Sequence, residues 1–407
     1  MAGFTARDKV QITILLLTLV PFAATVVFGA FRGDAGIVVL ATGLAIASSG
    51  FALAWGTESL QFVVSQVLAL AVLAVVQVVP EYSVEVVLAY RGATDPAILE
   101  YATAAMTGAN RLLLGAGWPA VFLLSYLASK RVGKPRDELE LEDQQSVEIF
   151  FLGLATLYSF VIVAKGSLGV VDAAALVAIF AVYLYLAKKM PPNEEERMEE
   201  LEGPALAVAS MKGARKLAAS ALFVALGGVV LILGAEPFVT SFLEVVSALG
   251  LNQYLMLQWL TPIITEVPET VTVFYWAAKT GKGSLALANL VSSKLNQWTV
   301  LVATIPLVYA VALRGFASIE LSPLQSQELL LTASQSIFGF ACLLDLKLSW
   351  REALILLSLF CLQLLVPPIR IEVSALYLIL ALVELFLNRK RMAVLGRVFS
   401  LFREHLH

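Results

Sequence analysis

The sequence has very few of the residues that bind transition metals or form covalent cross-links. Its two histidines, His405 and His407, lie in the C-terminal tail, and its two cysteines, Cys342 and Cys361, lie within apolar segments. These placements argue against an intramembrane metalloprotease and against a disulfide framework. The sequence also has no Gly-Lys-Ser or Gly-Lys-Thr phosphate-binding loop, which argues against a pump driven by ATP.

Charged residues are also scarce. They make up 14% of the 407 residues, whereas hydrophobic residues make up 59% and the mean hydropathy is +0.85. Apolar runs of about 20 residues, long enough to cross a bilayer as a helix, recur along the chain. We interpret the first run, residues 10–30, as a retained span because it is longer than the apolar part of a signal peptide. The composition predicts an all-α polytopic membrane protein, with the lipid bilayer as a partner and no nucleic-acid partner.

Charge clusters and Gly/Pro turns divide the chain into about twelve candidate spans. They cover residues 10–30, 35–56, 59–90, 97–128, 146–164, 170–188, 216–248, 252–278, 284–313, 327–345, 351–368 and 371–388. If the N-terminus is cytoplasmic, the inner loops hold most of the Lys and Arg residues, including Arg389-Lys390-Arg391. This asymmetry predicts a multi-pass membrane protein with both termini in the cytoplasm. The very short loops are compatible with the plasma (inner) membrane, which we expect as its location.

Two predicted spans contain a Pro-Glu pair, which a lipid-facing helix would not tolerate. Pro80-Glu81 lies in the third span and Pro268-Glu269 in the eighth, where Glu266 comes three residues earlier. A proline inside a helix frees a backbone oxygen, and a carboxylate at membrane depth requires a cation or a watery cavity. Two such segments facing each other would surround an ion with hard oxygen ligands, which suit Na⁺ or Ca²⁺.

These landmarks occur in the same order in two halves of the chain. Small-residue segments follow the Pro-Glu pairs at residues 104–117 and 286–301, and then come Asp172 and Glu352. With five spans in each half, the second half is inverted relative to the first. We therefore expect two inverted five-helix repeats with one extra span at each end, an architecture typical of secondary transporters. The expected divisions are an N-terminal extra span (1–34), a first repeat (35–188), a cytoplasmic connector (189–215), a second repeat (216–368) and a C-terminal span with a basic tail (369–407).

At these positions the sequence resembles the calcium/cation antiporter superfamily, of the sodium/calcium exchanger type. The resemblance covers most of residues 35–368, and its clearest segments are "TEVPE" (265–269), "ANLVSSKLNQ" (288–297) and "LDLKLSWREALILL" (344–357). It implies a ten-helix core in which Glu81 and Glu269 are the acidic ligands of the metal ion. It also implies Thr265, Ser293 and Gln297 as polar ligands from the second repeat. We expect Glu266 from the same repeat, and Gln77 and Asn110 from the first, to assist in ion binding, although Gln77 stands where the family has a small hydroxyl residue.

The sequence departs from the family pattern at two cations, Arg111 and Lys294, which fall within predicted spans. Three interpretations are open for them. They could form ion pairs with Glu85 and Glu266, they could snorkel to the helix ends, or they could replace a bound cation and couple transport to protons. Glu85 itself could belong to the ion site, four residues after Glu81, or could pair with Arg91.

These features predict a secondary active cation antiporter and not an enzyme. It would exchange Ca²⁺ or another cation for Na⁺ or H⁺ by alternating access, and it would need no cofactor apart from the transported inorganic cations. An alternative on the same fold is a cation channel or a non-transporting, ion-sensing membrane protein. Flux measurements separate the two, because exchange requires a gradient of a counter-ion and a channel does not.

Overall fold

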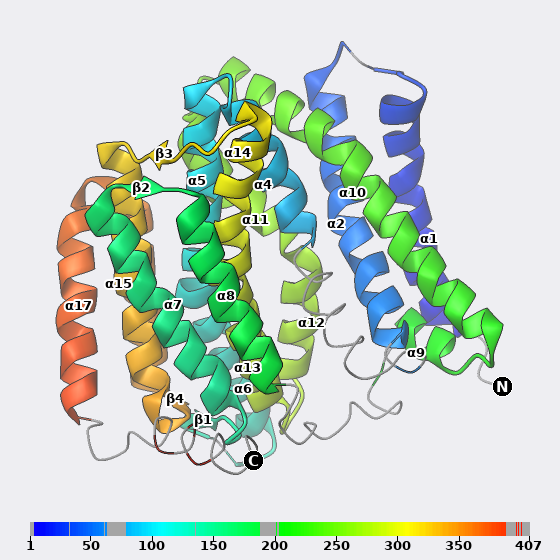
Figure 1. Cartoon of the computed structure of the whole chain (residues 1–407). Helices are drawn as coiled ribbons and strands as arrows, with labels where there is room; N and C mark the ends of the chain where they lie inside the picture. Colours follow the sequence, from blue (N-terminus) through cyan, green and yellow to red (C-terminus); the bar gives the residue numbers. More distant parts are fainter. Residues whose placement is uncertain are drawn as a thin grey trace. The chain divides into compact units, whose positions relative to one another are not determined.

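In the computed structural model, the described part of the chain is almost entirely helical and has four short strands (Figure 1). It describes residues 4–31, 33–60, 62, 79–134, 136–187, 201, 203–387, 396, 398 and 400. The α-helices are α1 (Ala6–Phe22), α2 (Ala35–Leu60), α4 (Val79–Gly92), α5 (Pro96–Leu112), α6 (Trp118–Arg131), α7 (Gln145–Lys165), α8 (Val170–Ala187), α9 (Gly203–Ala209), α10 (Ala214–Ala248), α11 (Gln253–Thr265), α12 (Val267–Ala277), α13 (Gly283–Asn296), α14 (Val302–Leu313), α15 (Pro323–Cys342), α16 (Trp350–Leu365) and α17 (Arg370–Leu387). The strands are β1 (Glu138–Glu140), β2 (Ser167–Leu168), β3 (Ile319–Glu320) and β4 (Lys347–Ser349).

The chain forms two compact units. Unit 1 comprises Met1–Leu88 and Pro192–Glu269, and unit 2 comprises Ala89–Pro191 and Thr270–His407. Each predicted repeat contributes to both units. The helices that carry the Pro-Glu pairs, α4 and α12, each begin in unit 1 and end in unit 2.

Unit 1 is built around a close pair of helices, α2 and α10, which lie side by side in Figure 1. Glycine permits this approach: a Cβ atom on Gly56 would lie 2.9 Å from the Ser220 carbonyl oxygen, and one on Gly227 would lie 2.8 Å from the Ser49 carbonyl oxygen. The hydroxyls of Ser59 and Ser220 form a 2.7 Å hydrogen bond between the same helices. Small residues are the usual means by which membrane helices bring their backbones together.

Unit 2 contains two long helical segments that each include a π-helical turn. The turn η2 (Leu113–Gly117) joins α5 to α6, and the turn η4 (Gln297–Leu301) joins α13 to α14. Each forms the end of the small-residue segment of its half of the chain. π-Helical turns are rare and commonly occur at functional sites.

Four short strands connect the helices of unit 2. The strand β1 pairs antiparallel with β4, with Leu139 opposite Leu348, and β2 pairs antiparallel with β3, with Leu168 opposite Ile319. The order strand, helix, strand, helix occurs in both halves, as β1-α7-β2-α8 and as β3-α15-β4-α16. Ser322 and Ser349 start α15 and α16 through capping boxes with Gln325 and Glu352.

Eight helical segments in the described residues are long and apolar enough to cross a membrane. They are Ala6–Val27, Ala35–Leu60, Pro96–Arg131, Gln145–Lys165, Val170–Ala187, Ala214–Ala248, Gly283–Leu313 and Pro323–Asp345. The other predicted spans are a segment partly outside the described residues (59–90), a helix pair interrupted at Glu266 (252–278), the 16-residue α16, and α17, which carries Arg370, Glu372 and Glu384. The number twelve therefore stays a prediction.

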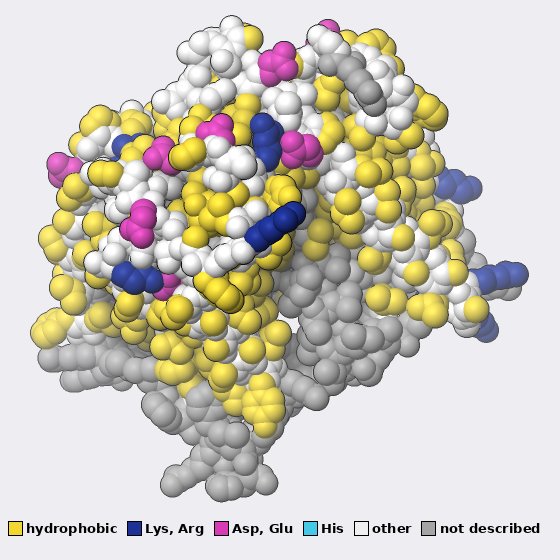
Figure 2. Space-filling view, turned by 45° about the horizontal axis from the view of Figure 1, so that its top comes forward, with side chains coloured by type: hydrophobic (Ala, Val, Ile, Leu, Met, Phe, Trp, Pro, Cys, Tyr) yellow, Lys and Arg dark blue, Asp and Glu magenta, His cyan; other side chains and the backbone are white. Residues whose placement is uncertain are grey.

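The outer surface of these helices is apolar. On α10, for example, Leu222 is 67% exposed and Ile232 is 79% exposed. Figure 2 shows hydrophobic side chains, in yellow, over much of the face in view, with charged side chains among them toward the top of that view. Such a surface is suited to lipid, whereas the buried polar side chains described below lie inside the two units.

Candidate ion-binding site

The segment around Glu266 interrupts a helix. α11 ends at Thr265 and α12 begins at Val267, while Glu266 lies between them with φ −90° and ψ −2°. Pro268 follows in the first turn of α12, where a missing N–H costs no hydrogen bond. Its ring packs directly on Gly50 of α2, where a larger residue would collide with it. The Pro-Glu sequence thus produces a helix break held against α2.

Three buried carboxyl groups of unit 1 come from this break and from α4. Glu81, Glu85 and Glu266 are 6%, 1% and 7% exposed. The carboxyl groups of Glu85 and Glu266 are close enough to interact electrostatically, and Tyr82 lies near both Glu81 and Glu85. Glu269 is partly buried in the first turn of α12. The structure therefore brings Glu85, which the sequence left open between two roles, into the same acidic cluster as Glu266.

Two like charges in a buried site repel each other, and the repulsion is relieved when a cation binds or when a carboxylate takes up a proton. Among the described residues, neither carboxylate oxygen of Glu85 has a hydrogen-bond partner. Within the same residues, no three acidic, histidine or cysteine side chains converge as a metal-binding group. A bound cation would therefore also use other oxygens, such as the hydroxyl of Thr265, which is buried and donates to the Thr261 carbonyl at 3.1 Å.

The predicted ligands of the small-residue segments lie in unit 2. Lys294 is fully buried, and its ammonium donates to the side-chain oxygen of Asn110 at 2.8 Å and to its carbonyl oxygen at 3.2 Å. The same ammonium lies 4.5 Å from the centre of the Trp298 ring, which adds a cation–π contact. The ammonium of Lys294 thus occupies a set of oxygen and π donors that would also suit a small cation.

Arg111 is buried in a second charged network of unit 2. Its guanidinium pairs with Glu328 of α15 and donates to Gln363 at 2.9 Å, and Arg370 donates to the other oxygen of Glu328 at 2.5 Å. Sequence reasoning missed Glu328, Gln363 and Arg370. A signal was present for Glu328, because a single acidic residue in an apolar run marks an ionisable group at membrane depth. Neither Arg111 nor Lys294 has the exposed head group of a snorkelling side chain, since they are 2% and 0% exposed.

The predicted site residues thus fall into two groups. Unit 1 holds Glu81, Glu85, Thr265, Glu266 and Glu269, and unit 2 holds Asn110, Arg111, Ser293, Lys294 and Gln297. Ser293 and Gln297 are buried in α13 and η4. Gln77 lies outside the described residues. The role of each residue as an ion ligand remains a prediction.

Comparison with known proteins identifies the family. Residues 35–189 and 219–367 match the family model described as sodium/calcium exchanger protein. The chain belongs to this exchanger family. The match covers both predicted repeats and confirms the resemblance to the calcium/cation antiporter superfamily. Glu85 and Glu266 of the acidic cluster, and Lys294 with its partner Asn110, all lie within the matched ranges.

Solved structures of exchangers share the fold. The H⁺/Ca²⁺ exchanger CAX is 34% identical, with a TM-score of 0.91 over 98% of each chain. The Ca²⁺/H⁺ antiporter protein YfkE is 12% identical, with a TM-score of 0.58 over 88% of this chain and 98% of that one. The sodium-calcium exchanger NCX_Mj is 15% identical, with a TM-score of 0.53 over 82% of this chain and 98% of that one. The last two similarities concern the fold alone. No curated protein matches the sequence.

The exchanger also contains a half-buried acidic residue, with one buried carboxylate oxygen, that sequence reasoning did not single out. Glu148 lies in the first turn of α7, and its Oε1 accepts hydrogen bonds from Tyr183 of α8 at 2.7 Å and from Ser292 of α13 at 2.8 Å. Ser292 directly precedes Ser293, one of the predicted ligands. Acidic residues are common in the first turn of a helix, so the position of Glu148 in the sequence did not mark it as a functional residue.

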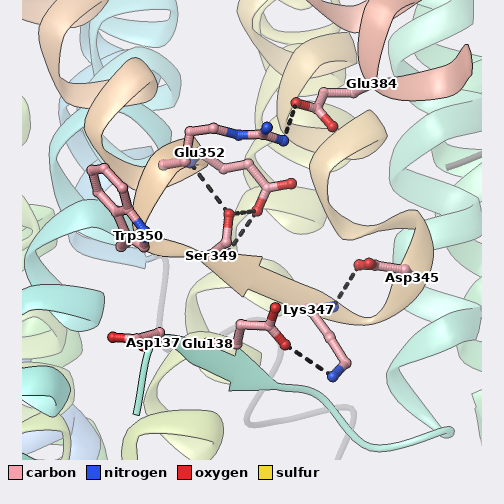
Figure 3. A pocket seen from close by; sticks show the side chains of 9 residues that line it. Asp137, Glu138, Asp345, Lys347, Ser349, Trp350, Glu352 and Glu384 are labelled. Atoms are coloured by element: carbon pink, nitrogen blue, oxygen red, sulfur yellow. Dashed lines mark hydrogen bonds and ion pairs between the residues drawn. The ribbon is translucent and has the colours of Figure 1, made fainter. Parts of the chain in front are cut away.

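A polar pocket of about 330 Å³ lies in unit 2 where β1 and β4 meet the start of α16 and the end of α17 (Figure 3). Its charged groups pair among themselves. Lys347 donates to Glu138 at 2.9 Å, Arg351 donates to Glu384 at 3.1 Å, and the Ser349 hydroxyl donates to Glu352 at 2.6 Å. These contacts hold the β1–β4 pair to the helices, and we assign them a structural role.

Proposed function

We propose that this exchanger is a secondary active antiporter that moves Ca²⁺ in exchange for H⁺. The protein shares 34% of its residues with an H⁺/Ca²⁺ exchanger over 98% of both chains, which supports this pair of ions. The acidic cluster of unit 1 would bind Ca²⁺ through Glu81, Glu85, Glu266 and Glu269. The hydroxyl of Thr265 would supply a further oxygen.

The observation that carries the proposal is the proximity of the buried carboxyl groups of Glu85 and Glu266. If both are ionised, their two negative charges are balanced by one Ca²⁺ ion. If both are protonated, they are neutral and no longer attract Ca²⁺. Because the same oxygens cannot hold a proton and ligate Ca²⁺ together, binding of one ion requires release of the other. Competition of this kind is what couples the two fluxes in an antiporter.

Alternating access would follow from the repeated architecture. The two halves share the strand-helix order and a π-helical turn at matching places, which supports two inverted repeats. The close pair α2 and α10 meets through glycine and serine, and we expect these two tightly packed helices to move together. Movement of this pair past the Pro-Glu helices would open the cluster to one side of the membrane at a time.

The positive charge of Lys294 supports H⁺ as the counter-ion in preference to Na⁺. Its ammonium already occupies the oxygen atoms of Asn110, so these atoms are not available to a sodium ion. A lysine can change its protonation state more easily than an arginine when it is buried, which also fits proton coupling.

The test is uptake of radioactive Ca²⁺ into proteoliposomes loaded with acid, compared with vesicles that have an outward Na⁺ gradient or no gradient. We expect uptake with the proton gradient, and we expect Glu266→Gln and Glu85→Gln to reduce it by at least tenfold. Glu244→Gln is the matched control, because Glu244 is an exposed acidic residue of α10 in the same unit. Uptake driven by the Na⁺ gradient would replace H⁺ with Na⁺ in the proposal, and equal uptake without any gradient would favour a channel.

A further inference from the structure

Glu148 differs from three buried acidic residues of unit 2 in the kind of partner that it has. Asp172 pairs with Lys165, Glu328 pairs with Arg111 and Arg370, and Glu384 pairs with Arg351. In the described residues, the hydrogen bonds of Glu148 come only from two neutral hydroxyl groups, those of Tyr183 and Ser292. Its second oxygen, Oε2, is buried and has no hydrogen-bond partner among the same residues.

A carboxylate in this position can bind a proton without breaking an ion pair. Burying an ionised group without a counter-charge is costly, so a proton at Oε2 removes an unfavourable charge. The hydroxyls of Tyr183 and Ser292 can continue to donate to Oε1 after protonation, because a carboxylic acid keeps acceptor capacity. Among the described residues, the side chains that hydrogen-bond to Glu148 come from α8 and α13, and Tyr183 is the titratable one of the two.

The contact with Ser292 links Glu148 to the helix that carries the predicted ligands. Ser292 lies on α13, next to Ser293 and two residues before Lys294. Helix α7 packs along α13, so Glu148 is held there by packing as well as by hydrogen bonds. Glu148 also lies only one turn from the start of α7, at the end that the loop charges predict to be cytoplasmic.

We propose that Glu148 is a proton-binding residue of the exchange cycle, separate from the acidic cluster of unit 1. A proton from water binds Oε2 and converts the carboxylate to a neutral carboxylic acid, and the same proton later returns to water as the carboxylate is restored. The hydrogen bond between Ser292 and Glu148 transmits this change of charge to α13. This inference rests on the proposed Ca²⁺/H⁺ exchange.

The test compares two kinds of transport in proteoliposomes that contain the full chain. Exchange of radioactive Ca²⁺ for unlabelled Ca²⁺ requires no net proton movement, whereas uptake into acid-loaded vesicles does. We expect the rate of Ca²⁺/Ca²⁺ exchange in Glu148→Gln to stay within about twofold of wild type. We expect its rate of proton-driven uptake to fall at least tenfold. Glu142→Gln is the matched control, because Glu142 is an exposed acidic residue six positions earlier, and it should resemble wild type in both assays.

The outcomes separate the inference from the proposed function. If wild type shows no proton-driven uptake, the proposed exchange fails. If wild type shows it and Glu148→Gln retains both the rate and its pH dependence, the role of Glu148 is overturned while the exchange stands.

Two milder variants keep the test decisive if Glu148→Gln does not fold. Tyr183→Phe and Ser292→Ala each remove one hydroxyl that stabilises the ionised carboxylate. We expect the midpoint of the pH profile of proton-driven uptake to move to higher pH in both, with Ca²⁺/Ca²⁺ exchange unchanged. An unaltered midpoint in both variants would overturn the proposal.

Discussion

Replacement of Glu328 by glutamine should strongly destabilise unit 2. The carboxylate of Glu328 pairs with Arg111 and with Arg370, and the three side chains are 1%, 2% and 15% exposed. Glutamine has nearly the same size and shape as glutamate. The substitution therefore removes the charge with little change in packing, and it leaves two guanidinium groups without their shared counter-ion.

The expected magnitude follows from burial. Arginine stays protonated even in a protein interior, so Arg111 cannot escape the cost by losing a proton. Removal of one partner of a buried ion pair costs about 3–5 kcal/mol. At roughly 2–4 °C per kcal/mol for a folded unit of this size class, the thermal midpoint should fall by roughly 6–20 °C. The hydrogen bond from Arg111 to Gln363, at 2.9 Å, remains and favours the lower part of that range.

The assay is thermal unfolding of the purified exchanger in mild detergent, followed by tryptophan fluorescence. Glu372→Gln is the control, because Glu372 is an exposed acidic residue of α17. A double variant, Arg111→Met with Glu328→Gln, should recover part of the loss because it removes the most deeply buried unpaired cation. The reasoning is refuted if Glu328→Gln lowers the midpoint no more than Glu372→Gln does.

Two further predictions concern other polar contacts of unit 2. Asn110→Ala should lower the free energy of unfolding by about 1.5–3 kcal/mol, because it removes the oxygen that accepts a 2.8 Å hydrogen bond from the buried Lys294 ammonium. Chemical unfolding measures the loss, and Asn289→Ala, on α13, is the control. Equal stability of the two variants would contradict the prediction. At the exposed strand pair, the hydrogen bond from Lys347 lowers the pKa of Glu140, and the hydrogen bonds to Glu140 and Glu138 raise the pKa of Lys347. The stabilising effect should therefore be lost as pH falls through the lowered pKa of Glu140 and as pH rises through the raised pKa of Lys347. Hydrogen exchange of the β1 and β4 amides across pH should show protection between these limits in wild type and a flat profile in Lys347→Met, with both profiles alike in high salt.

Local sequence signals predicted the elements of this fold well. Runs of apolar residues predicted the helices. Pro262 and Pro268, on either side of Glu266, indicated that this predicted span is interrupted. These features depend on residues that are neighbours in the chain. A proline acts on the backbone within one helical turn, so its effect can be inferred without knowing the rest of the structure.

Partners that are distant in the chain could not be predicted in the same way. Arg111 and Glu328 lie more than two hundred positions apart, and their pairing depends on how α5 packs against α15. The sequence offered Glu85 and Glu266 as partners for the two buried cations. The described ion pair of Arg111 is instead with Glu328. Arg370 lies between two predicted spans in the sequence, and the structure shows that it begins α17 and reaches Glu328.

The π-helical turns η2 and η4 have a consequence for comparing this exchanger with its relatives. Such a turn holds one residue more than the α-helical turn that it replaces. Loss of one residue within Leu113–Gly117 would let the segment close as a regular α-helix, and the residues after it would keep their helical faces. Trp118, which is fully buried, would therefore keep its present environment. A one-residue gap here in an alignment would therefore record a change of helix type, and the residues on either side of the gap should be compared by helical face as well as by position in the chain.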